Sequence, residues 1–221
     1  MIMKKLTLIL AISVLGAGFI YAQQKKTNAK PPAADNARKE NASSIEIDAP
    51  IPADNVQCIG TDHKQYTLRS QLTKKGLLVM FSCNTCPYVV KSQARTREIM
   101  AYAQELGLGM VIVNSNEAQR DADDAYQAMI DYSLRQQYSV PYLLDVNSKL
   151  AEAFGATRTP EVFLFNPEGR LVYKGAMEDN PADPATSKVM YLKNAIDNLI
   201  AGKTITPNST KSIGCSIKRK A

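Results

Sequence analysis

The sequence predicts an α/β fold in which helices cover a β-sheet. Three observations lead to this prediction: short apolar runs of strand length, amphipathic segments of helix length, and the alternation of the two along the middle of the chain. The 221 residues are 45% hydrophobic and 22% charged, as in an ordinary soluble globular protein, and this excludes collagen-like, fully disordered and polytopic membrane chains. One domain with tails is the expectation for this length.

The elements are expected in the order strand, helix, strand, helix, strand, helix, hairpin, helix, after a short N-terminal hairpin. Residues 56–68 indicate the two strands of that first hairpin, around a turn at 61–64. The apolar runs at 76–82 and 109–114 are typical of parallel strands buried on both faces. Further strands are expected at 141–145, 161–166 and 170–175, and helices at 86–107, 121–136, 147–154 and 187–201.

The first 22 residues have the pattern of a secretory signal peptide. Lys4 and Lys5 precede an apolar run that ends at the small residue Ala22. The alternative is a retained membrane anchor, although the run is near the lower length limit for a span. We expect export across the inner membrane to the periplasm, with membrane contact only through this segment if it is uncleaved. Residues 23–44 have no large apolar side chain and are expected to form a flexible linker.

The positive charge is concentrated at the two ends of the chain. Residues 1–44 and 202–221 each carry a net charge of +5, whereas residues 45–201 carry −4. Nucleic-acid binding requires a basic face on the folded part, so this distribution disfavours a nucleic-acid partner. We therefore expect a domain at 45–201 and a solvated basic C-terminal tail at 202–221.

The candidate chemistry lies in the C-x-x-C segment formed by Cys83 and Cys86. The segment follows the strand at 76–82 directly and opens a helix, where unpaired amide groups and the helix dipole favour a thiolate. Cys83 is predicted to be the exposed, attacking sulfur, and Cys86 the sulfur that resolves the mixed disulfide. This placement after an apolar strand favours a redox motif.

The cysteine pair has two other interpretations. A structural zinc site needs four ligands, and Cys58, Cys215 and His63 would have to complete it from scattered positions, so no metal site is assigned. The other alternative is an inert structural disulfide. His63, the single histidine, is expected to be an exposed turn residue.

A second feature supports redox chemistry. Thr159-Pro160 precedes the strand at 161–166 and, together with the upstream C-x-x-C, is a candidate cis peptide. With the phrases FSCNTCPYV, TRTPEVFLFNPEGRLVYKG and SIGCSIK, the chain resembles the thioredoxin superfamily. Within it, residues from about 50 to 200 resemble the redoxin (alkyl hydroperoxide reductase/thiol-specific antioxidant) branch, and most of all its peroxiredoxin-like, CxxC-containing group.

The resemblance implies a thioredoxin-like central mixed sheet flanked by helices, with an extra N-terminal hairpin. It also implies that Cys83 and Cys86 are the redox pair, that Pro160 is the cis-proline, and that Thr159 offers backbone hydrogen bonds to a bound thiol or peptide. Arg158 would then approach the cysteines, where its charge would favour a thiolate. The pattern P-x-x-x-T-x-x-C of true peroxiredoxins is missing, because Met80 stands where the threonine would be.

The remaining cysteines, Cys58 and Cys215, have open alternatives: a disulfide that ties the tail to the first hairpin, free buried thiols, or resolution of Cys83 by Cys215. We expect a thiol–disulfide oxidoreductase without a bound cofactor, acting on protein or small-molecule disulfides and thiols with an unidentified electron donor. The alternative is a thiol peroxidase in which Cys83 reacts with peroxide. A third interpretation is a thiol-based metal-binding module.

Overall fold

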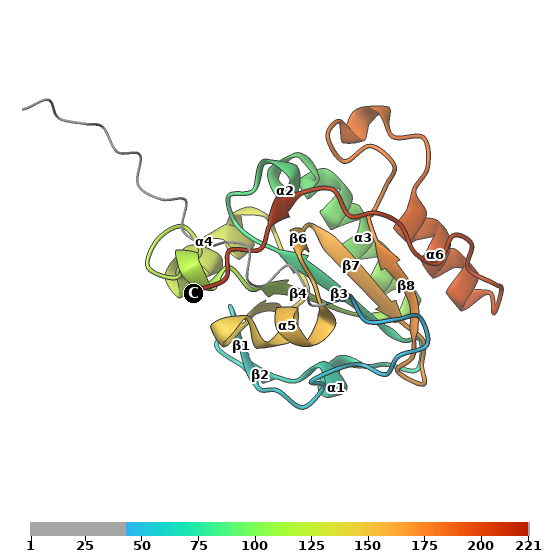
Figure 1. The fold of residues 1–221 in the computed structure, drawn as a ribbon, viewed down its shortest axis with the longest axis horizontal. Helices are drawn as coiled ribbons and strands as arrows, with labels where there is room; N and C mark the ends of the chain where they lie inside the picture. The colour runs from blue at the N-terminus through green and yellow to red at the C-terminus, as the bar shows by residue number, and fades with distance from the viewer. Residues whose placement is uncertain (1–42, 221) are drawn as a thin grey trace, which may run out of the picture. The chain divides into compact units, whose positions relative to one another are not determined.

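The computed structural model describes residues 43–220 (Figure 1). The predicted signal peptide, 1–22, and nearly all of the predicted linker, 23–44, lie outside the described residues. A seven-stranded sheet forms the centre, in the order β2-β1-β5-β4-β3-β7-β8. Its strands are β1 (Cys58–Gly60), β2 (Gln65–Tyr66), β3 (Leu77–Ser82), β4 (Gly109–Asn114), β5 (Tyr142–Leu144), β7 (Glu161–Phe165) and β8 (Leu171–Gly175).

The sheet is mixed, as predicted, and β3 lies inside it. β3 runs parallel to β4, with Leu77 opposite Gly109 and Ser82 opposite Asn114, and antiparallel to β7. β4 is parallel to β5, whereas β1, β2 and β8 pair antiparallel with their neighbours. All six side chains of β3 are buried, which explains why this strand is apolar throughout instead of alternating.

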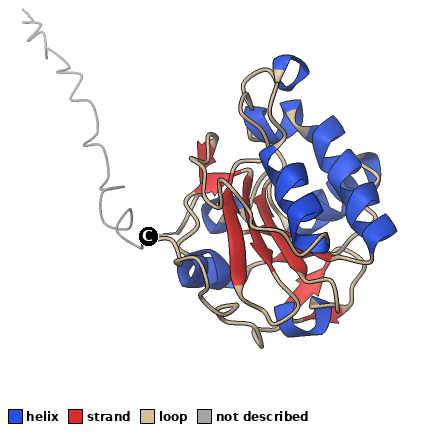
Figure 2. Ribbon diagram, turned by 90° about the vertical axis from the view of Figure 1, so that its right-hand side faces the viewer, coloured by secondary structure: helices blue, strands red, loops and turns tan. Residues whose placement is uncertain are grey.

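Helices cover both faces of the sheet, so that it lies between two helical layers (Figure 2). Leu78 and Met80 of β3 belong to a core cluster shared with α3, α4 and α6, whereas Leu77 and Phe81 face a cluster shared with α1 and α5. This division follows from the opposite directions of successive side chains in a strand. The helices are α1 (Leu68–Gln71), α2 (Pro87–Lys91), α3 (Gln93–Leu106), α4 (Tyr126–Arg135), α5 (Lys149–Phe154) and α6 (Tyr191–Ile200).

The helix predicted at 86–107 is divided in two. α2 ends at Lys91. The next residue, Ser92, leaves the helical range at φ −88° and ψ 7°, and α3 begins at Gln93. α3 ends at Gly107, where a φ of 69° requires the left-handed conformation that glycine adopts without a steric penalty. α2 is therefore a short helix of five residues that follows the C-x-x-C segment directly. It positions Cys86 at its N-cap.

The C-terminal segment, predicted as a solvated basic tail, has four exposed lysines but also contains a strand. β9 (Cys215–Ser216) pairs antiparallel with β6 (Arg158–Thr159) in a separate two-stranded sheet. Ile217 is buried in the core cluster on the α5 side. In Figure 1 the dark red β9 lies between β6 and α2. The basic residues of this segment lie outside the strand: Lys203 and Lys211 precede it, and Lys218, Arg219 and Lys220 follow it.

Among residues 43–220, no helix has the length and apolar character that a membrane crossing requires.

Candidate functional site: three cysteines at the cis-proline loop

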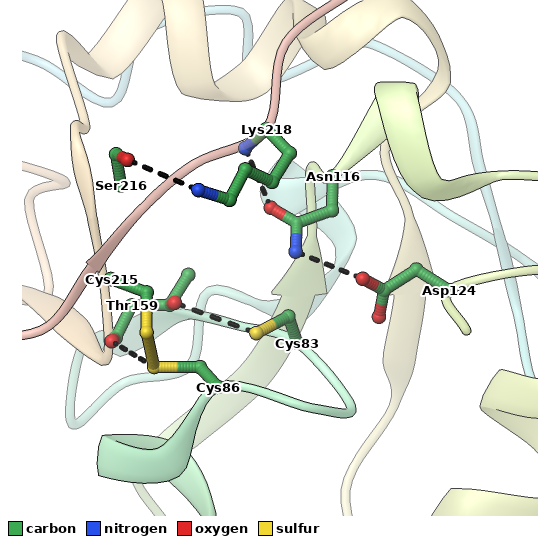
Figure 3. Close-up of a disulfide and its surroundings, with 8 residues drawn as sticks. All are labelled: Cys83, Cys86, Asn116, Asp124, Thr159, Cys215, Ser216 and Lys218. Carbon is green, nitrogen blue, oxygen red and sulfur yellow. Dashed lines mark hydrogen bonds between the residues drawn. A yellow bond between two sulfur atoms is a disulfide. The ribbon is translucent and has the colours of Figure 1, made fainter. Parts of the chain in front are cut away.

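Three segments that are distant in sequence converge at the carboxyl end of β3. Cys83 follows β3 directly, Cys86 caps α2, and β9 brings Cys215 next to Thr159 (Figure 3). Cys83 and Cys86 share a small apolar cluster with Val89, against which Cys215 packs. The predicted redox pair and the predicted cis-proline loop therefore form one site, and Cys215 joins it.

A disulfide joins Cys86 to Cys215, with a Cα–Cα distance of 6.0 Å and 129 residues between the two in sequence. The β6–β9 register explains this pairing, because it places Cys215 directly opposite Thr159 at the cysteine site. The pairing of Cys58 with Cys215, one of the alternatives left open by the sequence, is therefore wrong. Cys58 is a free, buried thiol on β1, in the core cluster of the α5 side.

Thr159 contacts both cysteines of the C-x-x-C segment. Its Oγ1 shares a hydrogen bond with Cys83 Sγ at 3.5 Å, and its carbonyl oxygen lies 3.3 Å from Cys86 Sγ. The Thr159-Pro160 peptide is cis, as predicted. In the reduced protein, a Cys86 thiol at this place can donate its proton to the Thr159 carbonyl.

Cys83 is buried, which corrects the expectation of an exposed nucleophile: only 2% of the residue is accessible. Burial raises the pKa of the Cys83 thiol, and the negative charge of Asp124 raises it further. The Thr159 hydroxyl and the backbone amides of Thr85 and Cys86 act in the opposite direction. With Cys86 bonded to Cys215, the amides at the start of α2 do reach the Cys83 sulfur, as predicted. Desolvation nevertheless has the larger effect on the Cys83 pKa.

Arg158 contributes its backbone to the site. Its N–H donates to Glu161 Oε2 at 3.1 Å, next to the Thr157 N–H, which donates to the same oxygen at 2.8 Å. Glu161 Oε1 accepts from Ser212 Oγ at 3.0 Å. The Glu161 carboxylate thus ties the cis-proline loop to the C-terminal segment.

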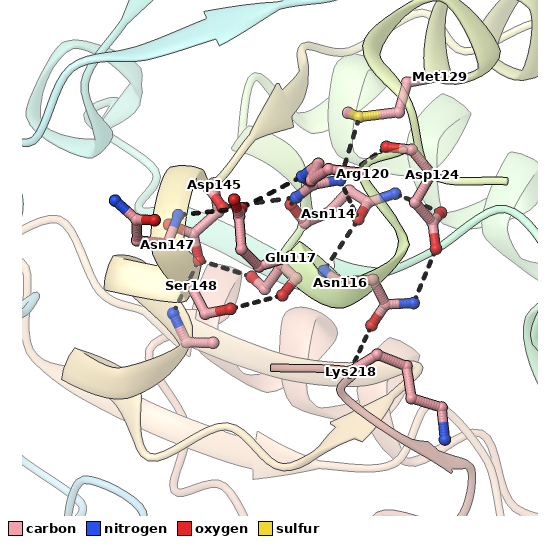
Figure 4. A network of polar contacts seen from close by, with 12 residues as sticks. Asn114, Asn116, Glu117, Arg120, Asp124, Met129, Asp145, Asn147, Ser148 and Lys218 are labelled. Carbon is pink, nitrogen blue, oxygen red and sulfur yellow. Dashed lines mark hydrogen bonds and ion pairs between the residues drawn. The ribbon is translucent and has the colours of Figure 1, made fainter. Parts of the chain in front are cut away.

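A buried polar network that the sequence analysis missed supports the C-x-x-C loop (Figure 4). Asp124 is fully buried, and its carboxylate accepts hydrogen bonds from Asn84 N–H at 2.9 Å, Asn114 Nδ2 at 2.7 Å and Asn116 Nδ2 at 2.9 Å. Arg120 adds bonds from Nη1 to Asn114 Oδ1 and to the Asp124 carbonyl, both at 2.9 Å. Asn84 lies between the two cysteines, so Asp124 fixes their loop.

The same network holds the C-terminal segment. Asn116 Oδ1 accepts from the Lys218 N–H at 2.9 Å, and the Ala118 N–H donates to the Lys218 carbonyl at 2.8 Å. Asn116 therefore connects Asp124, which holds the C-x-x-C loop, with the strand that carries Cys215. The only sequence signal for these residues was the position of Asn114 at the end of a predicted buried strand.

Phenolic side chains border the site on the other side. Tyr142 Oη donates to Asn84 Oδ1 at 2.8 Å, and Gln93 Nε2 donates to the hydroxyls of Tyr132 at 2.7 Å and Tyr138 at 3.2 Å. Burial raises the pKa of all three tyrosines, in the case of Tyr138 to about 12. These groups therefore stay neutral at physiological pH and do not stabilise a thiolate by charge.

Gly214 allows the C-terminal strand to lie close to the cis-proline loop. A Cβ atom at this position would overlap the carbonyl oxygen of Thr159 and approach the nitrogen of Pro160. The residue next to Cys215 therefore has to lack a side chain for β9 to pair with β6.

In the described part of the chain, no cluster of three or more His, Cys, Asp or Glu side chains is arranged to hold a metal ion.

Comparison with solved structures identifies similar folds. A hypothetical protein from Sinorhizobium meliloti 1021 is 31% identical, with 80% of this chain and 97% of that chain covered and a TM-score of 0.72. An uncharacterized conserved protein from Geobacillus kaustophilus is 26% identical, with 80% and 94% covered and a TM-score of 0.75.

A third structure, the C-terminal domain of a protein described as a thiol-disulfide oxidoreductase from Bacteroides thetaiotaomicron, shares the fold at 19% identity. It covers 71% of this chain and 97% of its own, with a TM-score of 0.55. A search of curated proteins found no significant match. The family model of Redoxin matches residues 46–190, more than half of the sequence. The chain therefore belongs to the Redoxin family and is an oxidoreductase.

Proposed function

We propose that this protein is an extracytoplasmic thiol–disulfide oxidoreductase whose redox pair is Cys83 and Cys86. In the reduced protein, the Cys83 thiolate attacks a substrate disulfide, a mixed disulfide forms, and one substrate thiol leaves. Cys86 then attacks Cys83 Sγ, which releases the second substrate thiol and leaves a Cys83–Cys86 disulfide. Two electrons pass from the pair to the substrate, and no bound cofactor is required because the sulfurs carry them.

One observation carries this proposal: both sulfurs of the C-x-x-C segment contact Thr159 of the cis-proline loop, and Cys86 is already bonded to a third cysteine. A disulfide beside a free thiol is the arrangement that thiol–disulfide exchange needs. The proposed location agrees with the signal-like segment at 1–22 and with a disulfide, since such bonds persist in oxidising compartments.

The test is reduction of insulin disulfides by the mature protein with dithiothreitol as the electron source. The wild-type protein is expected to accelerate the precipitation of the insulin B chain, and Cys83→Ser and Cys86→Ser are expected to abolish the acceleration. Cys58→Ser is the matched control, because it removes a buried thiol that lies outside the site. Equal rates for wild type and Cys83→Ser would refute the proposed function.

A thiol peroxidase is the second candidate, and one contact favours it. The Thr159 hydroxyl beside Cys83 supplies a hydroxyl of the kind that the sequence lacks at Met80. In this reaction the Cys83 thiolate attacks a peroxide oxygen, an alcohol or water leaves, and Cys83 becomes a sulfenic acid. Rapid oxidation of Cys83 by hydrogen peroxide, followed by mass spectrometry, would support it. A rate no higher than that of an unactivated cysteine would exclude it.

A further inference from the structure

We propose that Cys215 is a third redox cysteine, which moves the disulfide between the buried Cys83–Cys86 pair and the protein surface. This inference rests on the proposed function, because it assigns the route by which the oxidised pair is reduced again. It starts from a difference between the sulfurs. Cys83 and Cys86 are 2% and 4% exposed, whereas Cys215 is only partly buried.

The transfer is an internal thiol–disulfide exchange. When the Cys83–Cys86 disulfide has formed, the Cys215 thiolate attacks Cys86 Sγ. The Cys83–Cys86 bond breaks, the Cys86–Cys215 bond forms, and Cys83 leaves as a thiolate that takes up the proton lost by Cys215. The numbers of disulfides and thiols do not change, so the step needs no external oxidant or reductant. The disulfide present in the structure is the product of this step.

Cys86 is the shared sulfur of both disulfides, and its position suits that role. It caps α2 directly after the Cys83–Thr85 stretch, while β9 lies on its other side (Figure 3). Thr159 contacts Cys83 through its side chain, contacts Cys86 through its carbonyl, and is the register partner of Cys215. One residue of the cis-proline loop thus adjoins all three cysteines.

The C-terminal strand is anchored on both sides of Cys215 by contacts that do not depend on the disulfide. Three residues before it, Ser212 Oγ donates to Glu161 Oε1 at 3.0 Å. Three residues after it, the Lys218 N–H donates to Asn116 Oδ1 at 2.9 Å. Ile217, between them, is 6% exposed. When the bond to Cys86 opens, the Cys215 thiol therefore remains next to its partner.

This anchoring makes attack by Cys215 on the Cys83–Cys86 disulfide faster than attack by an external thiol. A group tethered by a short segment has an effective concentration of the order of millimolar or more. An external thiol at micromolar concentration cannot compete with it, and Cys83 and Cys86 are less exposed to such a thiol than Cys215 is. An external donor therefore meets the disulfide at Cys215 and not at Cys83.

The direct test follows the disulfides in time. The fully reduced protein is treated with one equivalent of diamide, quenched rapidly with acid and alkylated, and its disulfides are mapped by mass spectrometry. We expect Cys83–Cys86 to appear first and to convert into Cys86–Cys215 at a rate that does not depend on protein concentration. Cys215→Ser is expected to accumulate Cys83–Cys86, and Cys58→Ser is expected to behave like the wild type.

Two results would overturn the proposal: absence of a Cys83–Cys86 species in the wild type at every quench time, or its persistence without conversion. A second measurement uses dithiothreitol as the probe donor. Cys215→Ser, oxidised at Cys83–Cys86, is expected to be reduced about ten-fold or more slowly than the oxidised wild type, because Cys83 and Cys86 are each less exposed than Cys215. Equal reduction rates would also contradict the proposal.

These experiments use no substrate disulfide, so they separate the two proposals. Conversion of Cys83–Cys86 into Cys86–Cys215 without insulin reduction would support the transfer and reject the function. Insulin reduction without this conversion would leave the function standing and reject the role of Cys215.

Discussion

Reduction of the Cys86–Cys215 disulfide should markedly lower the free energy of unfolding. The bond joins residues 129 apart, and the chain-entropy relation for a loop of this length gives about 5 kcal/mol. Native disulfides typically contribute about 2–5 kcal/mol, so a loss of about 3–5 kcal/mol is expected on reduction. This is a large fraction of the stability of an ordinary domain, about 5–15 kcal/mol.

The variant Cys58→Ser/Cys83→Ser is suited to this measurement, because Cys86 and Cys215 are its only remaining cysteines. Urea unfolding of its oxidised and reduced forms can be followed by far-UV circular dichroism or tyrosine fluorescence, since the chain has ten tyrosines and no tryptophan. With a dependence of about 2 kcal/mol per molar urea, the midpoint should fall by about 2 M on reduction.

The reasoning would be refuted by coincident unfolding curves for the two forms. That result would mean that the bond does not restrict the unfolded chain, or that Cys86 and Cys215 do not pair. Disulfide mapping of the oxidised sample separates these two explanations.

Three further predictions concern the surroundings of the site. Asn116→Ala removes the acceptor of the Lys218 N–H, so hydrogen exchange at that amide should accelerate and stability should fall by about 1–3 kcal/mol; unchanged exchange would contradict the anchoring role. Thr159→Val removes a hydroxyl that lowers the pKa of Cys83, so alkylation of Cys83 in the oxidised protein should require a higher pH, and an unchanged pH profile would argue against the contact. Burial raises the pKa of Cys58 to about 12, above its usual value of about 8.5. As the pH rises, the Cys58 thiol therefore loses its proton in the unfolded state before it does so in the folded state. Above pH about 8.5 the free energy of unfolding should fall by up to about 1.4 kcal/mol per pH unit. Urea titrations between pH about 8 and 9.5 should show a flatter decline for Cys58→Ala than for the wild type.

The sequence predicted the strands of the sheet well, because burial on both faces leaves a strong local signal. The runs at 76–82 and 109–114 became β3 (Leu77–Ser82) and β4 (Gly109–Asn114). The cis peptide at Thr159-Pro160 was also confirmed, since a proline at this place before a strand is itself a local feature. The features that depend only on residues close together in sequence, such as these strands and the cis peptide, were therefore predicted correctly.

The parts that failed depend on contacts between distant segments. The pairing of Cys215 with Cys86 follows from the path of the last strand across β6, which no local pattern encodes. The burial of Cys83 results from the same path and from the side chains around it, so a helix N-terminus alone was an insufficient guide to its pKa. The Asp124 network was not predicted because its residues come together only in the folded chain.

Gly214 has a consequence for which substitutions the C-terminal segment can accept. Its neighbour Ile213 is 41% exposed and is free to vary, because its side chain is directed at least partly to solvent. At Gly214, even a methyl group would collide with backbone atoms of the cis-proline loop, and backbone cannot move aside as a flexible side chain can. Replacement by alanine would therefore separate β9, and Cys215 with it, from β6, although all four cysteines would still be present in the sequence. A glycine at position 214 is thus as necessary for the Cys86–Cys215 disulfide as the two cysteines themselves.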